Sequence, residues 1–468
     1  MMDRNSHKSQ QDRIDQYLNI LEKEPALLKP AQNTLQKFEE TADRMYAVTF
    51  APVIINFVLW VLKSAEQQGI KRLYFLSRDA YPMYLAAKEL LKKESLGIEI
   101  DIRYLRVSRY SLRIPEYHLL GEQCLDRIFL SGIDISMYQI LNRAQLSEEE
   151  MIQVCRELQY EKDLRDILNR AEILRLKERT MDACKSGVCS LLSMVYRHSK
   201  ECFDNTLGYL SQKGMLDDVR YAVVDSGWVG SIQKSLQNLL ATAKPDIKVY
   251  GYYFGLYELP EDTRGCEYKA FYFMPKGSIS RKTKFSNCLF EVVYSEPCGM
   301  VKYYDRSEKL YVPVLSAVES PNEGQLKNNE KVLKTFIGEL IKEQAVLKEQ
   351  FKQMNKETVK VVEKLFSRLM AHPSKWEASY YGGQMFSDDL ADEHMRKTAN
   401  ELSQQEIRDL RALSKIKIML GLSKKVIHES AWIEGTIVNG KENIAVNLWS
   451  AHIAKTLTYM RQSLRAKQ

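Results

Sequence analysis

The sequence lacks a secretory leader, a long hydrophobic run and a cysteine framework. The N-terminal stretch MMDRNSHKSQQDRIDQY is polar and has no apolar core followed by a small-residue cleavage site, so no signal peptide is predicted. The longest apolar run, FAPVIINFVLWVL from Phe50 to Leu62, falls short of the roughly 20 residues of a membrane helix. The eight cysteines form no C-x-x-C pair. We therefore expect no membrane span, reduced thiols and a cytoplasmic location.

Familiar motifs for binding nucleotides, metals and nucleic acids are also missing. Neither G-x-x-x-x-G-K-[ST] nor G-x-G-x-x-G occurs. The seven histidines are dispersed without H-x-x-x-H or H-x-x-E-H spacing, which argues against zinc hydrolysis. The formal net charge of +7 is not gathered into a basic stripe with stacking aromatics, so nucleic acid is not an expected partner.

Alternating strand and helix patterns predict an α/β fold. Hydrophobic residues make up 45% of the chain, enough for a sizeable core. Ile70–Leu76 and Ile98–Val107 have the composition of buried strands, with the amphipathic helix MYLAAKELLKK between them. A second strand, helix and strand series runs through Val219–Asp225, IQKSLQNLL and Ile247–Tyr257. Two such units indicate an open, mainly parallel Rossmann-like sheet with helical additions.

The composition divides the chain into five regions. Ser147, with Glu150 three residues later, marks a helix start inside a charged helical region between the two sheet halves. From residue 328 to 370, apolar residues near every third or fourth position predict one or two long amphipathic helices packed on the sheet domain. A coiled-coil seam or another protein partner is the alternative. The expected regions are a helical N-terminal arm (1–48), the first half of the α/β domain (49–117), a helical insertion or cap (118–215), the second half (216–318) and a helical C-terminal region (319–468).

Three of the predicted strands end in polar residues. Ligands of doubly wound sheets lie beyond the carboxyl ends of the strands, so these residues are expected to converge on one edge. The clusters are Ser77-Arg78-Asp79, Ser108-Arg109 and Asp225-Ser226-Gly227.

The third cluster continues into VVDSGWVGSIQKSL, which predicts an anion site. Gly227 and Gly230, on either side of Trp228, allow a tight turn, and Ser231 stands where the next helix begins. Free amide groups and the positive end of the helix dipole would then face the ligand. A tight turn without a ligand is the alternative.

Charged residues near these strand ends could supply binding and catalysis. Arg78 and Arg109 offer planar guanidinium groups to phosphate or carboxylate, unless they pair with neighbouring carboxylates such as Asp79. Asp79 or Asp225 could act as acid, base or metal ligand, with helix capping as the alternative for Asp225. Glu291 is a third catalytic candidate, or an ordinary exposed helix carboxylate. No cofactor is specified, and Mg²⁺ is the candidate metal.

Several segments together resemble a bacterial family of predicted hydrolases of the haloacid-dehalogenase superfamily, found in surface-polysaccharide gene clusters. The resemblance spans roughly residues 45 to 305. The matching segments are FAPVIINFVLWVLKSAEQQGIKRLYFLSRDAYPM, IRYLRVSRYSLRIP, VVDSGWVGSIQ and LFEVVYSEPCGMVKYY, with AWIEGTIVNG near the end.

The chain departs from that family at the catalytic motif. Members typically begin with a phosphatase domain whose nucleophile lies in D-x-F-D-T, and no such segment occurs before residue 45. Asp225 has Gly227 in place of the second acid, and Asp79 is followed by Ala80 and Tyr81. The region resembled is therefore the one that follows the phosphatase domain, and a hydrolase label would rest on association.

Two functions are compatible with these patterns. The first is an enzyme that binds a phosphorylated sugar or nucleotide-sugar at the strand ends and transfers or hydrolyses a glycosyl or phosphoryl group. The second is a non-catalytic binding or scaffold module of polysaccharide assembly.

Overall fold

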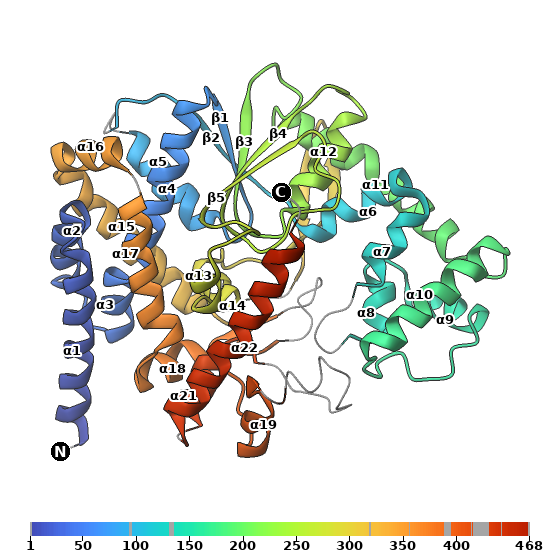
Figure 1. Ribbon diagram of the computed structural model, residues 1–468. Coiled ribbons are helices and arrows are strands. Elements are labelled where there is room, and N and C mark those ends of the chain that lie inside the picture. The colour runs from blue at the N-terminus through green and yellow to red at the C-terminus, as the bar shows by residue number, and fades with distance from the viewer. Residues whose placement is uncertain are drawn as a thin grey trace.

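The centre of the molecule is a five-stranded parallel sheet with helices on both faces (Figure 1). The computed structural model describes residues 2–92, 96–130, 135–317, 320–354, 356–387, 395–412, 414, 430–440 and 442–466. The sheet has the order β2-β1-β3-β4-β5, with all neighbours parallel. This confirms the predicted Rossmann-like α/β fold. Its strands are β1 Arg72–Leu76, β2 Asp101–Leu105, β3 Tyr221–Trp228, β4 Val249–Leu256 and β5 Cys266–Phe273.

Alternate residues of the buried strands enter two different cores. Leu73 and Phe75 of β1 pack on one face with α4 (Phe50–Gln67) and α5 (Tyr81–Lys92). Tyr74 and Leu76 point to the other face, which is covered by α6 (Arg109–Leu120), α11 (Leu191–Gln212) and α12 (Ser231–Ala241). Because side chains of a strand alternate in direction, a strand that is apolar throughout must be covered on both sides.

The apolar run beginning at Phe50 forms the core helix α4. Pro52 lies in its first turn, where the missing N–H breaks no helical hydrogen bond. Among the described residues, Thr41–Gln67 is the one helical stretch long and apolar enough to cross a membrane, but 94% of its apolar window is buried in the protein. That burial is typical of a core helix.

The N-terminal and C-terminal helices share a core with the sheet. The N-terminal helices lie beside the C-terminal ones along one side of the molecule (Figure 1), and Tyr17 is buried in the same cluster as Phe75 and Phe336. The N-terminal helices are α1 Met2–Leu21, α2 Pro25–Leu35 and α3 Thr41–Val48. The C-terminal elements are α15 Glu323–Lys342, α16 Gln344–Gln353, α17 Lys356–Phe366, the π-helical turn η2 Ser367–Ala371, α18 Lys375–Gly382, α19 Gln404–Asp409, α21 Ile433–Asn439, α22 Ile444–Arg465 and the short pair β8 Met385–Phe386 and β9 Arg396–Lys397.

The prediction of one or two long helices after residue 328 is wrong, since three helices occupy this stretch. Each packs against different neighbours: α15 against α2, α3 and α5, α16 against α2 and α4, and α17 against α1. The chain must turn between them to make these contacts. The apolar face of α15 is therefore used inside the molecule, against the α/β domain and the N-terminal arm.

The helices between β2 and β3 have an apolar core of their own, centred on residues such as Leu125, Ile140 and Val154. They project from the side of the sheet domain (Figure 1). Ser147 caps α9 through the predicted capping box with Glu150. The elements are η1 Gly121–Gln123, α7 Cys124–Ile128, α8 Met137–Asn142, α9 Glu148–Glu157 and α10 Arg170–Lys185, leading into α11.

The predicted strand boundaries differ from the structure most at the end of β3 and in β2. β3 continues through Trp228, because the backbone N–H groups of Tyr257 and Glu258 donate to the Trp228 carbonyl oxygen at 2.8 and 3.2 Å. The turn expected from Ser226 to Ser231 is thus only Val229 and Gly230. β2 is shorter than predicted at both ends.

The segment MVKYY, residues 300 to 304, leads into an antiparallel hairpin outside the main sheet. It forms β6 (Val301–Ser307), which pairs with β7 (Leu310–Leu315). Two short helices, α13 (Ile279–Thr283) and α14 (Asn287–Tyr294), connect β5 to this hairpin.

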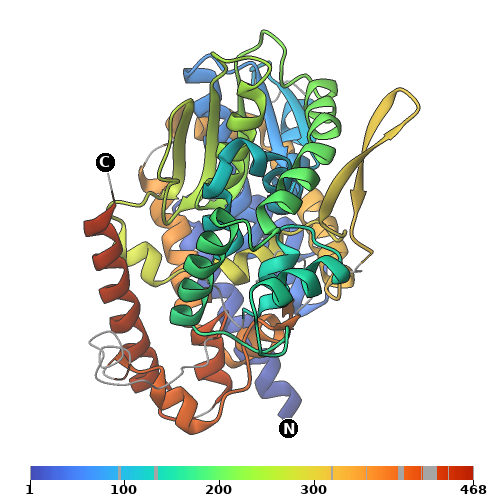
Figure 2. The ribbon, with the colours of Figure 1, turned by 90° about the vertical axis from the view of Figure 1, so that its right-hand side faces the viewer.

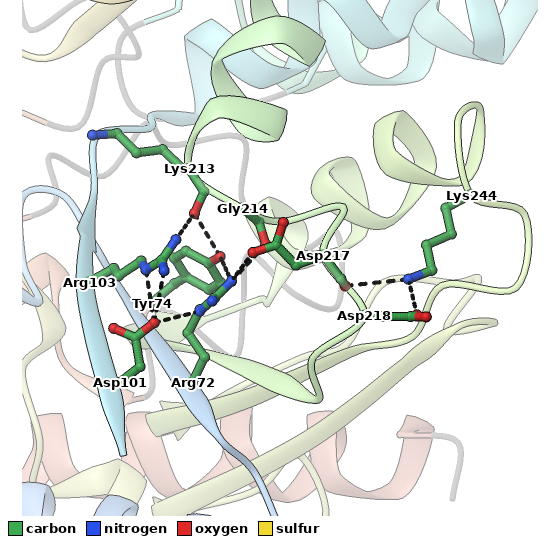
Figure 3. Close-up of polar contacts among 9 residues, drawn as sticks. All are labelled: Arg72, Tyr74, Asp101, Arg103, Lys213, Gly214, Asp217, Asp218 and Lys244. Carbon is green, nitrogen blue, oxygen red and sulfur yellow. Dashed lines mark hydrogen bonds and ion pairs between the residues drawn. The ribbon is translucent and has the colours of Figure 1, made fainter. Parts of the chain in front are cut away.

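An ion-pair network holds the amino ends of β1 and β2 to the turn after α11 (Figure 3). Arg72 donates from Nε to Asp101 Oδ2 and from Nη1 to Asp217 Oδ2, both at 2.7 Å, and to the Gly214 carbonyl oxygen at 2.9 Å. Tyr74 donates to the Lys213 carbonyl oxygen at 2.9 Å. One guanidinium thus joins two strands to the helical insertion at the edge opposite the strand carboxyl ends.

Replacing Arg72 with methionine is expected to lower the free energy of unfolding by about 2 kcal/mol. The Arg72 side chain is only 10% exposed, but its partners Asp101 and Asp217 are 43% and 49% exposed, so solvent screens part of the attraction. Urea denaturation measures the loss. The matched control is Lys71→Met, which removes an exposed charge at the adjacent position. Equal losses in the two variants would show that the network does not stabilise the fold.

Candidate functional site

The strand carboxyl ends open into a cleft of about 490 Å³. The chain passes from β1 to β2 on one side of β1 and then crosses to β3 on its other side, so the order in which strands are added reverses between β1 and β3. Doubly wound sheets bind ligands at such a point. The structure brings all twelve predicted site residues to the lining of this one cleft: Ser77, Arg78, Asp79, Ser108, Arg109, Asp225, Ser226, Gly227, Trp228, Gly230, Ser231 and Glu291.

Ser77 and Ser108 hold the loops that form the cleft wall. Ser77 Oγ donates to the Val107 carbonyl oxygen at 2.7 Å and accepts from the Val107 N–H at 2.9 Å. Ser108 Oγ donates to the Val301 carbonyl oxygen at 2.6 Å and caps α6 by accepting from the Ser111 N–H. Both hydroxyl protons therefore go to backbone carbonyls, which makes these serines positioning groups in this geometry.

Asp225 and Asp79 bring two carboxyl groups together where β1 and β3 end. Asp225 is 8% exposed. Burial, and then the nearby Asp79 carboxylate, raise the pKa of Asp225 to about 7, against the opposing effects of backbone N–H groups and Arg109. Ser226 Oγ donates to Asp79 Oδ2 at 2.9 Å and holds that side chain. Asp225 can therefore gain or lose a proton near neutral pH, as a general acid or base requires.

The two glycines of VVDSGWVGSIQ serve different purposes. Gly227 has φ of +125° inside β3, and a Cβ there would lie 1.9 Å from the Gly255 carbonyl oxygen of β4. It is required by the close approach of two strands, rather than by the predicted turn. Gly230, with φ of +68°, is the residue before α12, and no side chain caps that helix. The first turn of α12, beginning at Ser231, thus borders the cleft.

Four arginines line the cleft, and two of them, Arg78 and Arg109, were predicted from the sequence. Arg109 is exposed and has no ion pair within the described part of the chain, whereas Arg78 donates to the Cys298 carbonyl oxygen at 3.4 Å. Arg113 is buried and donates to Ser231 Oγ at 3.4 Å, at the start of α12. Burial lowers the pKa of Arg113 to about 10, which leaves it charged at neutral pH. Arg143 comes from the helical insertion.

Sequence reasoning missed Arg113 although a signal was present. Arg109 and Arg113 are four residues apart in α6, a spacing that places both on one face of the helix. Arg143 gave no such signal, because only the folded insertion brings it to the strand ends. Three further lining residues were also missed: Tyr110 directly follows Arg109, Glu258 follows the end of β4, and Ser387 comes from the C-terminal region.

Glu291 faces the cleft and is joined to β3 through Trp228. The indole Nε1 of Trp228 donates to Glu291 Oε1 at 2.5 Å, and its ring packs on Phe285 and Phe290. Beyond Glu291, Arg78 and Asp79, a side pocket of about 90 Å³ opens from the same residues. The cleft and the side pocket therefore share these charged side chains.

No protein-family model matches this chain, and no curated protein does. The chemistry of the cleft must therefore be argued from its own geometry. Four guanidinium groups and a helix N-terminus favour an anionic ligand, and the two aspartates supply a proton donor or acceptor.

Mg²⁺ fits this arrangement only with help from a ligand. Within the described residues, no group of three or more histidine, cysteine, aspartate or glutamate side chains is placed to hold a metal ion. Mg²⁺ is commonly held by one or two carboxylates together with water and substrate phosphates. Asp79 and Asp225 offer two such carboxylates, and their mutual repulsion, visible in the raised pKa of Asp225, would be relieved by a divalent cation.

Proposed function

We propose that the cleft binds a phosphorylated sugar or nucleotide-sugar and catalyses transfer or hydrolysis of its glycosyl or phosphoryl group. The observation that carries this proposal is a carboxyl group titrating near neutrality, Asp225, in a cleft that also holds four arginines and the start of α12. The volume of about 490 Å³ lies within the range of small-molecule sites. The resemblance to predicted hydrolases of surface-polysaccharide clusters supports the proposal, which also includes a cytoplasmic location.

The phosphate is assigned to the region between α6 and α12. Arg109, Arg113 and the first amides of α12 supply fixed positive charge there. Phosphoryl and glycosyl-phosphate chemistry depends mainly on positioning and on charge that stabilises developing negative oxygens. Because Arg113 is buried and held beside Ser231, little reorganisation is needed when the ligand arrives.

Asp225 is assigned the proton transfer. In its ionised form it accepts a proton from the attacking hydroxyl or water, and in its protonated form it donates one to the leaving group. Burial, and then the carboxylate of Asp79 that Ser226 holds, keep the pKa of Asp225 near the working range. Mg²⁺, when held by Asp79 together with phosphate oxygens and water, would add positive charge at the phosphate and leave Asp225 free to carry the proton.

Arg109→Ala is expected to weaken binding of a nucleotide-sugar about 10-fold to 100-fold, because one charge-assisted contact is lost. The measurement is the rise in melting temperature of the full chain with a panel of nucleotide-sugars and sugar phosphates, with and without Mg²⁺. Arg306→Ala, an exposed arginine on the β6–β7 hairpin, is the matched control and should behave like the wild type.

Product analysis separates catalysis from binding alone. A melting shift that Arg109→Ala removes, accompanied by product, supports the enzyme. The same shift without product identifies a binding or scaffold module. If no phosphorylated ligand raises the melting temperature of the wild-type protein, the assignment of the cleft as an anion-binding site is wrong.

A further inference from the structure

The C-terminal helix α22 presents an apolar stripe to solvent. Its residues follow one another at intervals of three, eight, three and four positions, which places them on one side of the helix. The helix rises through the lower middle of the view in Figure 1 and runs along the left edge of the molecule in Figure 2. The stripe consists of Val446 (54% exposed), Trp449 (68%), Leu457 (40%), Met460 (46%) and Leu464 (87%).

The other sides of α22 are fixed to the protein. Leu448 and Ala451 pack in a small core with Ile437 of α21. Tyr459 stacks on Tyr257, with ring centroids 5.3 Å apart, and Ser463 Oγ accepts from the Gly277 N–H at 2.9 Å. These contacts run along the helix from its first turns to its last, so the stripe cannot be buried by turning α22 on its axis.

The surroundings of the stripe are basic. α22 contains no aspartate or glutamate, and Arg461 and Arg465 are exposed beside the apolar residues. The segment from 274 to 285, which includes α13 packed on α22, also lacks acidic residues and carries Lys276 and Lys284. None of these four basic groups has an ion pair in the described part of the chain. The patch therefore combines apolar area with unneutralised positive charge.

We propose that this face of α22 binds an anionic lipid surface. Exposed apolar side chains, an interfacial tryptophan and an excess of basic residues are the features with which a helix lies in the plane of a membrane. Glu258 Oε1, which accepts from Gln462 Nε2 at 2.7 Å, offsets part of this charge, but the four basic groups without an ion pair among the described residues outweigh it. A second copy of α22 fits less well, because pairing in either direction would bring two basic helices together without a carboxylate to offset them. The helix would lie on the surface without crossing it.

Co-sedimentation of the full chain with lipid vesicles tests the proposal. The protein should bind vesicles containing about 30% phosphatidylglycerol in phosphatidylcholine, bind pure phosphatidylcholine much more weakly, and be released at about 0.5 M salt. Arg461→Gln with Arg465→Gln should lower partitioning about 25-fold, at about fivefold per basic residue. The matched control is Lys348→Gln with Lys352→Gln, two exposed lysines with the same spacing on α16.

The double variant Trp449→Ser with Leu464→Ser tests the contribution of the apolar stripe and should abolish vesicle binding. Its melting temperature should match that of the wild type, since both side chains are exposed. Equal binding to neutral and anionic vesicles, or an equal loss in the α16 control, would overturn the assignment to anionic lipid. A wild-type protein that does not bind vesicles would also overturn the assignment. This holds both for a protein that stays monomeric and for one that forms a dimer which the serine variants dissociate.

Discussion

Asp225→Asn is expected to make the protein more stable at about pH 8 and to lower its turnover at least 100-fold. General acid or base catalysis contributes about 100-fold to 10,000-fold, and asparagine cannot exchange the proton. The stability gain arises because ionising a buried carboxyl group costs free energy. The pKa of Asp225 is raised from an ordinary value of 3.8 to about 7 by burial and by Asp79.

The sign follows from the two pKa values. Below about pH 4 the carboxyl group is protonated in both folded and unfolded chains, so it has no pH-dependent effect. Between that pH and about pH 7 the unfolded chain loses the proton first, and the folded state becomes less stable by up to about 4 kcal/mol. Asparagine at position 225 removes this pH-dependent loss of stability, and its side-chain oxygen can still accept from the N–H groups of Ser226 and Gly227.

Urea denaturation from about pH 4 to pH 8 measures this effect as the difference between the variant and wild-type curves. The difference should be small at the acidic end and grow toward neutrality. Asp79→Asn is the companion variant, because removing its charge should shrink the pH-dependent fall without abolishing it. Parallel curves for Asp225→Asn and the wild type would show that Asp225 does not titrate in this range.

Glu24→Gln is the second variant with a large expected effect. Glu24 is not one of the residues that line the cleft. Glu24 precedes α2, is 3% exposed and accepts a hydrogen bond from Asn56 Nδ2 at 2.7 Å. Burial raises its pKa from 4.5 to about 7, because this hydrogen bond only partly offsets the loss of water. The wild-type protein should therefore lose up to about 3 kcal/mol of stability between about pH 4 and pH 7 through this group.

Glutamine should remove that loss. Its amide can donate to Asn56 Oδ1, which has no hydrogen-bond partner among the described residues. The measurement is again urea denaturation against pH, and the double variant with Asp225→Asn should show the sum of the two single effects, as separated sites usually do. A Glu24→Gln protein that is less stable than the wild type at about pH 8 would contradict the assignment.

The location of the cleft followed from local sequence patterns and one topological rule. Ser77-Arg78-Asp79 and Ser108-Arg109 each follow a strand, and Asp225-Ser226-Gly227 lies in the last half of β3. Parallel strands place their carboxyl ends on one edge of the sheet, so all three clusters line the cleft. The roles of these residues could not be predicted from the sequence, because they depend on neighbours from other elements. Ser77 bonds to Val107, and Gly227 is fixed by Gly255, contacts that exist only after the strands pair.

The sequence by itself determined the fold class, the core helix α4 and the polar strand ends, because these depend on periodicity and composition within short segments. Only the tertiary structure decided which groups are charged and which surfaces stay open. The pKa of Asp225 depends on its burial in the fold and on Asp79, which lies in the turn between β1 and α5. The exposed stripe of α22 was likewise invisible in the sequence, since an amphipathic helix does not reveal which of its apolar residues the fold will cover.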